Sequence, residues 1–205
     1  MPLTIDDIIV APPEPDRRLD FDRIFARHAP LEMEIGSGKG GFLLRQARAN
    51  PDRNYFGIEW ANKYVRYAAD RMVRWSVANV RLMRTDAAHF MQHHVPERCL
   101  DALHVYHPDP WPKKRHHKRR LFQPPFVEAA VRALKPDARW AVQTDHADYY
   151  HIIRELLDAR GELVEIPFED PDYGTVDDRT ETNFEVKYLR QGRQIHRLAY
   201  RRAKE

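Results

Sequence analysis

The chain has 205 residues, of which 42% are hydrophobic and 32% are charged, and its formal net charge is +3 at pH 7. This length suits one domain with a complete core, and the composition excludes a chain that is disordered throughout. The one cysteine, Cys99, excludes an intramolecular disulfide and a cysteine metal site. No N-terminal signal pattern is present, and no stretch approaches the roughly 20 apolar residues that a bilayer span needs. We therefore expect a cytoplasmic protein without membrane contact.

Residues 1–30 lack a regular hydrophobic period, and three prolines interrupt the stretch APPEPDRR, so we predict an N-terminal arm with a short helix near Phe21–His28. From residue 31 onward, short apolar runs alternate with amphipathic stretches, which predicts one domain over residues 31–205. Strands are predicted at residues 31–35, 54–59, 80–84, 100–106, 138–144, 162–166 and 195–200. Helices are predicted at residues 41–49, 62–75, 87–92, 126–134 and 147–159. This alternation predicts an α/β fold with a mostly parallel sheet covered on both faces.

The sequence GSGKGG begins where the first strand ends, so its backbone can bend tightly and approach a ligand closely. Gly36, Gly38 and Gly41 match the dinucleotide fingerprint, and Glu59 ends the next strand at a distance typical of a carboxylate that binds ribose hydroxyls. Both NAD and S-adenosylmethionine have such a ribose. Glu34, two residues before the first glycine, would repel a pyrophosphate, whereas it suits the ammonium and sulfonium of S-adenosylmethionine. The turn therefore favours the methyl donor over NAD.

Asp86 ends the third predicted strand and extends this pattern. A carboxylate there can accept a hydrogen bond from the adenine amino group, while the Ala87 amide reaches a ring nitrogen. The alternative is that Asp86 caps the helix predicted at residues 87–92, which is a common role for aspartate. The same residue can fill both roles.

The segment His107–Arg120 follows the fourth strand at the carboxyl edge of the sheet, where open α/β folds bind their ligands. Prolines alternate with Asp109 and Trp111 in the sequence PDPWP, and we expect them to hold these two residues in a fixed extended shape. A flexible loop would not require three prolines. Function is therefore expected to concentrate in this segment.

A basic run follows directly: of the eight residues from Lys113 to Arg120, six are Lys or Arg and the others are His116 and His117. Because the run begins beside the expected donor site, we interpret it as a phosphate-binding surface, with a merely solvated face as the alternative. The two histidines lack the spacing of metal ligands combined with carboxylates or cysteines. No metal is expected.

The segments LEMEIGSGKG, GIEW, TDAAHF, PDPWPKKRHHKRR, TDHADYY and TNFE occur in this order, and with them the sequence resembles the bacterial single-chain tRNA (guanine-N7-)-methyltransferase family. The glycine motif is shared by many methyltransferases, but PDPWPKKRHHKRR is close to a signature. The resemblance implies a Rossmann-like class I methyltransferase whose seven-stranded, mostly parallel sheet has a reversed last strand. It also implies transfer of a methyl group from S-adenosylmethionine to N7 of a guanine in the tRNA variable loop, which gives 7-methylguanosine and S-adenosylhomocysteine. The partner is then tRNA, and no obligatory protein partner is implied.

The resemblance also assigns roles to individual residues. Positions that contact the donor in the family match Glu34, Glu59, Asp86 and Asp109, and the last of these also has the catalytic role. Positions that meet the target nucleoside match Lys113, Asp145, Thr182, Asn183, Phe184 and Glu185. Positions that bind RNA match Arg115, His116, His117, Lys118, Arg119 and Arg120. Relatives usually carry a basic residue where this chain has Asn183, so the resemblance implies a role for its backbone rather than its side chain.

Guanine N7 carries a lone pair and no proton, so methyl transfer requires in-line placement more than a general base. We expect Asp109 to hold the guanine by its N1 and N2 hydrogens, with stabilisation of the developing positive charge as the alternative. Three other functions compete with this one: methylation of another RNA, NAD-dependent oxidoreduction, and RNA binding on a degenerate methyltransferase scaffold. The basic run and the lack of an evident redox partner disfavour the oxidoreductase, and the intact acidic residues disfavour the degenerate scaffold.

Overall fold

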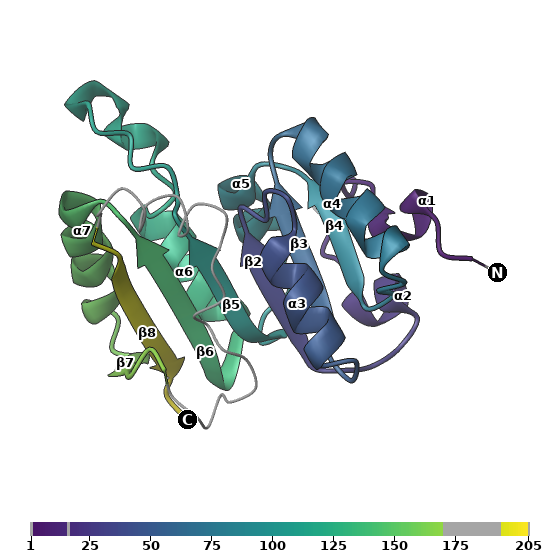
Figure 1. Ribbon diagram of the computed structural model, residues 1–205. Coiled ribbons are helices and arrows are strands. Elements are labelled where there is room, and N and C mark those ends of the chain that lie inside the picture. The colour runs from purple at the N-terminus through teal and green to yellow at the C-terminus, as the bar shows by residue number, and fades with distance from the viewer. Residues whose placement is uncertain (1, 16, 170–193, 205) are drawn as a thin grey trace.

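The computed structural model describes residues 2–15, 17–169 and 194–204. In this part of the chain, one eight-stranded sheet has the order β1-β4-β3-β2-β5-β6-β8-β7 (Figure 1). Neighbouring strands from β1 to β6 are parallel, whereas β8 runs antiparallel to both β6 and β7. The strands are β1 (Ile9–Val10), β2 (Leu31–Ile35), β3 (Asn54–Glu59), β4 (Val80–Arg84), β5 (Leu100–Tyr106), β6 (Leu134–Thr144), β7 (Leu163–Ile166) and β8 (His196–Arg202).

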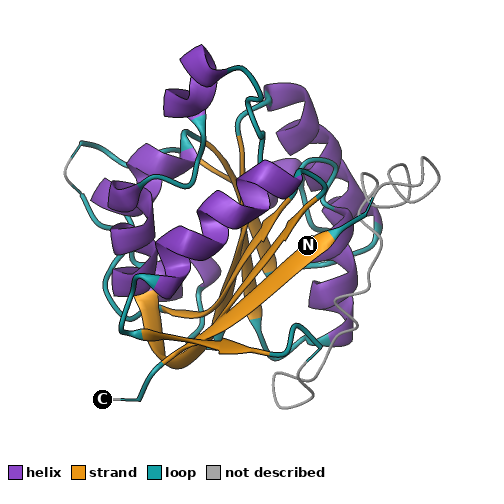
Figure 2. Cartoon of the chain, turned by 90° about the vertical axis from the view of Figure 1, so that its left-hand side faces the viewer, coloured by secondary structure: helices purple, strands orange, loops and turns teal. Residues whose placement is uncertain are grey.

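Helices cover both faces of the sheet, as the view from the side shows (Figure 2). The α-helices are α1 (Ile5–Ile8), α2 (Phe21–Phe25), α3 (Gly41–Ala49), α4 (Asn62–Arg74), α5 (Ala87–His93), α6 (Pro124–Ala133) and α7 (Ala147–Asp158), and the 3-10 helix η1 spans Lys114–Arg119. Buried side chains of α1, α3 and α4 form one apolar cluster, and those of α2, α5, α6 and α7 form the other. None of the helices in the described residues is long and apolar enough to cross a membrane.

The predicted fold is confirmed, including the mostly parallel sheet and the reversed strand β8. One strand was not predicted. The arm expected at residues 1–30 contributes β1, in which Ile9 and Val10 pair in parallel with Leu82 and Met83 of β4. The preceding residue, Ile8, is fully buried. The arm therefore extends the sheet rather than standing apart from it, and a strand of two residues is too short to show a period in the sequence.

Gly57 lies in β3, where α3 and the glycine turn approach the sheet. A Cβ at this position would lie 2.5 Å from Leu43 Cδ1 and from Ser37 Oγ, and 2.6 Å from Leu82 Cδ2. We predict that Gly57→Ala lowers the free energy of unfolding by about 1–3 kcal/mol, because buried neighbours must move apart. Urea denaturation measures this loss. Gly161→Ala is the matched control, since nothing lies within 4 Å of the Cβ position there. Equal stability of the two variants would contradict the prediction.

Candidate active site

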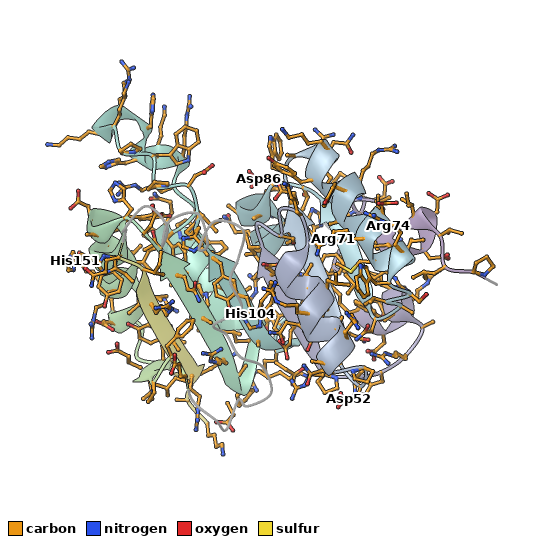
Figure 3. All side chains as sticks on the ribbon, in the orientation of Figure 1. Asp52, Arg71, Arg74, Asp86, His104 and His151 are labelled. Atoms are coloured by element: carbon orange, nitrogen blue, oxygen red, sulfur yellow. The ribbon has the colours of Figure 1, made fainter. Side chains whose placement is uncertain are left out.

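A cavity of about 550 Å³ opens at the carboxyl edge of the sheet, beyond β2, β3, β4 and β5. The turns that follow these four strands form its walls, together with the segment that leads into η1. Asp86 marks this edge in Figure 3. Six of the seven residues predicted to bind the donor line the cavity: Gly36, Gly38, Glu59, Asp86, Ala87 and Asp109. Parallel strands place their carboxyl ends at one edge, which is why residues so far apart in the sequence meet here.

The carboxylate of Glu59 is held in place by the backbone of two turns. Its Oε2 accepts a hydrogen bond from the Gly38 amide at 2.9 Å, and its Oε1 accepts one from the Ala61 amide at 2.8 Å. Each oxygen keeps capacity for a further donor, so the group is preorganised to accept two hydroxyl protons. Gly36 has a φ of +82°, and nothing lies within 4 Å of its missing Cβ, so open space reaches the backbone of the turn.

Glu34 lies in β2, two residues before Gly36, and only 4% of its surface is exposed; it is not among the residues that line the cavity. Among the described residues, none forms a hydrogen bond with its Oε2. Burial raises the pKa of Glu34 to about 8, against the attraction of Arg45 and with the repulsion of Glu59. A buried oxygen without a partner is costly, and a cationic ligand group would satisfy it. Together with the open space at Gly36, this carboxyl fits the ammonium end of S-adenosylmethionine.

Asp86 fills the role of helix cap that the sequence allowed. Its Oδ1 accepts a hydrogen bond from the His89 amide at 2.8 Å at the start of α5. Asp86 is also exposed and lines the cavity. The helix cap and a contact with a ligand are therefore compatible in one residue.

The PDPWP segment differs from its predicted extended shape. Trp111 has a φ of +41°, and His107, just before the segment, has a φ of +52°. Both values lie in the left-handed region, which bulky side chains rarely adopt and which is often found at functional sites. The Arg119 guanidinium lies 5.1 Å from the centroid of the Trp111 ring. Because Asp109, Trp111 and Arg119 all line the cavity, the segment and η1 form one of its walls.

Asp145 follows β6, and its Oδ1 lies 3.8 Å from His107 Nδ1. Burial lowers the pKa of His107 to about 4, although the charge of Asp145 opposes this change. The imidazole is therefore neutral near pH 7. His107 lines the cavity, so the structure places Asp145 next to the cavity wall.

A series of hydrogen-bonded polar side chains, buried on the α3 side of the sheet, ends at the cavity wall. Arg53 Nη1 donates to Glu32 Oε1 at 3.1 Å, and Glu32 Oε2 lies 2.9 Å from His104 Nε2. His104 Nδ1 in turn lies 2.9 Å from Tyr106 Oη, and Tyr106 lines the cavity. Burial favours a higher pKa for Glu32, but the hydrogen bonds and charges of His104 and Arg53 lower it. His104, in the middle of the sheet in Figure 3, thus connects a buried ion pair to the cavity wall.

The basic run forms η1, which projects from the carboxyl edge of the sheet (Figure 1). Five of its cations are exposed: Lys113, Lys114, Arg115, Lys118 and Arg119. His116 and His117 are partly buried, and the His116 ring packs against Trp111 with centroids 5.8 Å apart. Lys113 caps η1 and does not line the cavity.

Arg120 was predicted to bind RNA, but the structure buries its side chain. Only 5% of Arg120 is exposed. Its Nε donates to the Pro110 carbonyl at 2.7 Å, and its guanidinium lies 4.8 Å from the centroid of the Tyr149 ring. Arg120 therefore anchors the PDPWP segment to α7 and is not available to a phosphate.

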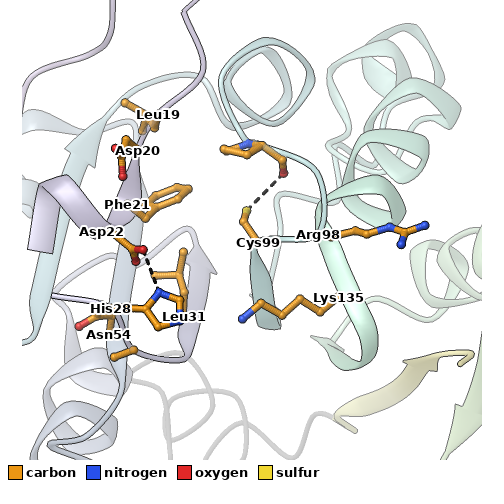
Figure 4. A pocket seen from close by; sticks show the side chains of 12 residues that line it. Leu19, Asp20, Phe21, Asp22, His28, Leu31, Asn54, Arg98, Cys99 and Lys135 are labelled. Atoms are coloured by element: carbon orange, nitrogen blue, oxygen red, sulfur yellow. Dashed lines mark hydrogen bonds and ion pairs between the residues drawn. The ribbon is translucent and has the colours of Figure 1, made fainter.

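A second cavity, of about 350 Å³, lies at the opposite, amino edge of the sheet (Figure 4). One wall carries Asp22, whose Oδ2 lies 2.8 Å from His28 Nδ1, and the other carries Cys99, whose Sγ donates to the Pro96 carbonyl. Burial raises the pKa of Cys99 to about 12, so the thiol stays protonated and unreactive near neutral pH. The carboxyl-edge cavity is therefore the candidate active site. No group of three or more His, Cys, Asp or Glu in the described residues is arranged to hold a metal ion.

Comparisons with known proteins agree with this geometry. Residues 28–198 match a family described as "Putative methyltransferase". The tRNA (guanine-N(7)-)-methyltransferase of Alkalilimnicola ehrlichii is 40% identical over 190 residues, which cover 93% of this chain and 80% of the relative. The chain belongs to the tRNA (guanine-N7-)-methyltransferase family. The family predicted from the sequence is thus confirmed.

Solved structures show the same fold at low sequence identity. The aminoglycoside resistance methyltransferase NpmB1 is 16% identical, with a TM-score of 0.59 over 89% of this chain and 92% of that chain. Phosphoethanolamine N-methyltransferase 2 of Haemonchus contortus, solved in complex with S-adenosyl-L-methionine, is 13% identical, with a TM-score of 0.55. That match covers 90% of this chain and 51% of that chain. At these identities the likeness concerns the fold of methyltransferases alone.

Several cavity residues of this methyltransferase were missed from the sequence. Trp60 directly follows Glu59, lines the cavity and is 66% exposed. An aromatic residue next to an acid at the end of a strand is a sequence signal that could have predicted this position in the cavity. Tyr64 and Tyr106 also line the cavity. In the sequence, Tyr64 stands within a predicted helix and Tyr106 at the end of an apolar strand, and neither position by itself indicates a ligand site. Thr182, Asn183, Phe184 and Glu185 lie outside the described residues, and their roles stay predictions.

Proposed function

We propose that this chain transfers a methyl group from S-adenosylmethionine to N7 of a guanine in tRNA, in the variable loop as the family resemblance implies. The observation that carries the proposal is the buried Glu34 carboxyl with an unpartnered oxygen, two residues before Gly36 of the glycine turn that lines the cavity. S-adenosylmethionine supplies a methyl group on a sulfonium. In the proposal, Glu34 binds the ammonium, Glu59 binds the ribose hydroxyls, and Asp86 with the Ala87 amide binds the adenine. Gly36 and Gly38 allow the donor to approach the backbone of the turn closely.

Asp109 is the proposed catalytic residue, and it also contacts the donor. It is exposed at the cavity wall, and no hydrogen bond to its carboxylate is found among the described residues. Because N7 has no proton to lose, the task of Asp109 is to hold the guanine edge so that N7 faces the methyl group in line. Lys113 and Asp145 are proposed to anchor the nucleoside, together with Thr182, Asn183, Phe184 and Glu185.

Arg115, His116, His117, Lys118 and Arg119 are the proposed RNA contacts of η1. Their support is the projection of η1 beside the cavity and the exposure of its Lys and Arg side chains. Since tRNA is the proposed substrate, the cytoplasm is the proposed place of action, and the proposal requires neither a metal nor a protein partner.

Incubation of unmodified tRNA with donor labelled in its methyl group tests the function. Nucleoside digestion is expected to give labelled 7-methylguanosine. A different labelled nucleoside would contradict the reaction at N7, and label in another RNA but not in tRNA would favour the alternative substrate. A chain that binds tRNA and leaves no label would be an RNA-binding protein on a methyltransferase scaffold.

We predict that Arg115→Gln combined with Lys118→Gln weakens tRNA binding, because both side chains are exposed on η1. The slope of log Kd against log salt should fall by roughly one unit per lost phosphate contact at most. Fluorescence anisotropy at several salt concentrations measures both quantities. Arg120→Gln is the contrasting variant: it should lower the melting temperature, since it removes a buried hydrogen bond. Unchanged tRNA binding of the double variant at low salt would show that η1 is only a solvated face.

A further inference from the structure

A second basic surface lies on α4 and on the two loops beside it. We define the α4 patch as Lys39, Lys63, Arg66, Arg71 and Arg84, all of them exposed except Arg71, which is partly buried. α4 contains one acidic residue, Asp70, and its Oδ2 lies 2.7 Å from Arg74 Nη2, outside the patch. Arg71 and Arg74 are labelled on α4 in Figure 3.

Two sets of contacts join the loops of the patch to α4 and to the turn before it. Arg71 Nη1 donates to the Lys39 carbonyl at 2.9 Å, which joins α4 to the glycine turn. The Lys39 ammonium lies 5.7 Å from the centroid of the exposed Tyr67 ring. Arg84 Nε donates to the Trp60 carbonyl at 3.1 Å, which joins the end of β4 to the turn before α4. The opposite face of α4 is buried in the core, so the cations occupy the face directed to solvent.

The patch and η1 lie on opposite sides of the candidate active site. Trp60, Ala61 and Tyr64, at the start of α4, form one wall of the cavity. Trp111 and Arg119, at the two ends of the basic loop, form the other. A base that enters the cavity therefore passes between two basic surfaces.

The positive charge of these two surfaces is large compared with the net charge of the whole chain. The α4 patch carries five cations, and η1 with its cap carries five exposed cations. The formal charge of the chain is +3, so these +10 charges leave −7 for all other residues. Among the described residues, no carboxylate forms an ion pair with Lys39, Lys63 or Arg66. A basic surface beside a cavity, in which these three cations form no such ion pair, fits a polyanion.

We infer that the α4 patch is a second RNA contact surface, which binds phosphates on the side of the target nucleotide opposite to those bound by η1. The inference rests on the proposed function, because it takes RNA as the substrate. Each nucleotide has a phosphate on both sides, so a strand that delivers one base into the cavity extends over both walls. Trp60 and Tyr67 are 66% and 46% exposed among the cations of the patch. Exposed aromatic rings interleaved with cations are typical of surfaces that bind single-stranded nucleic acid.

The test is the double variant Lys63→Gln with Arg66→Gln, compared with a control that loses two cations elsewhere. Arg23→Gln with Lys204→Gln is this control, because both residues are exposed and lie near the amino edge of the sheet. Affinity for unmodified tRNA is measured by fluorescence anisotropy at several salt concentrations. We expect the patch variant to bind about tenfold more weakly near 0.1 M salt, with a slope lower by roughly 0.7–0.9 per lost contact. The control should match the wild type, and turnover at saturating tRNA should be retained.

Three further variants decide how the result is interpreted. The exchange Lys63→Arg with Arg66→Lys keeps both charges and should restore the affinity. If it does not, charge is not the cause and the inference fails. If the double variant is poorly folded, Lys39→Gln and Arg84→Gln test the same patch from outside α4, and the inference requires both to lower the slope. If the patch variants bind as the control does while the wild type produces 7-methylguanosine, the inference is overturned and the proposed function stands. A wild type that leaves tRNA unlabelled overturns the proposed function instead.

Discussion

Asp109→Ala is expected to lower kcat/KM for tRNA methylation by at least about a hundredfold, with a much smaller effect on the affinity for S-adenosylmethionine. The reason is geometric. Without a proton to transfer, the rate depends on how well the guanine is held in line with the methyl group, and misplacement by about 1 Å can cost on the order of a hundredfold. Initial rates at saturating donor give kcat/KM for tRNA, and calorimetry gives the donor affinity.

Asp109→Asn separates the two roles that are open to this carboxylate. An amide oxygen still accepts one hydrogen bond from the guanine edge, so a holding role predicts that Asn retains more activity than Ala. A role in stabilising positive charge predicts equal losses, because both variants remove the charge. Asp148→Ala is the matched control, since Asp148 is an exposed carboxylate at the start of α7. Near wild-type methylation by Asp109→Ala would show that Asp109 is not catalytic.

Donor affinity is expected to rise from pH 6 to about pH 8 because of Glu34, whose pKa is raised to about 8 by burial. Below that pH the carboxyl is mostly protonated and must lose its proton to pair with the donor ammonium. Affinity therefore gains up to about tenfold per pH unit well below the pKa. Above roughly pH 8 the α-amino group of the donor itself loses its proton, so the affinity passes through a maximum.

Glu34→Gln should weaken donor binding by about 10- to 100-fold near pH 8, as expected for a lost charged hydrogen bond, and should flatten the rise with pH. Calorimetry in buffers of different ionisation enthalpy measures the proton released when the donor binds to the wild type. S-adenosylhomocysteine keeps the ammonium and lacks the sulfonium, so it serves as the control ligand. A pH-dependent rise seen only with S-adenosylmethionine would assign Glu34 to the sulfonium. If donor affinity still rises with pH in Glu34→Gln, the titrating group is a residue other than Glu34.

The sequence was informative wherever a functional residue ends a strand. Glu59, Asp86 and Asp145 each stand at or just after a strand whose period is clear, and parallel strands bring such ends to one edge of the sheet. Backbone shape was harder to predict. The left-handed conformations of His107 and Trp111 break the usual preference of bulky residues, so composition suggested an extended segment.

Tertiary contacts account for most of the remaining differences. Arg120 continues a run of exposed cations in the sequence, and only the position of Tyr149 on α7 shows that it is buried. α6 begins at Pro124, two residues before the predicted start, because proline is favourable in the first turn of a helix even though it interrupts a helix elsewhere. Trp60 was not predicted to line the cavity, because the acid beside it already accounted for the motif.

The ten cations of the α4 patch and of η1 with its cap concentrate positive charge on the two walls of the cavity. This charge attracts and orients an approaching polyanion, so tRNA is expected to meet the cavity walls before any hydrogen bond forms. Such orientation acts on the association rate and fades as ions screen the field, whereas short-range contacts set the dissociation rate. Stopped-flow measurements should therefore show that added salt lowers the association rate constant for tRNA by a larger factor than it raises the dissociation rate constant.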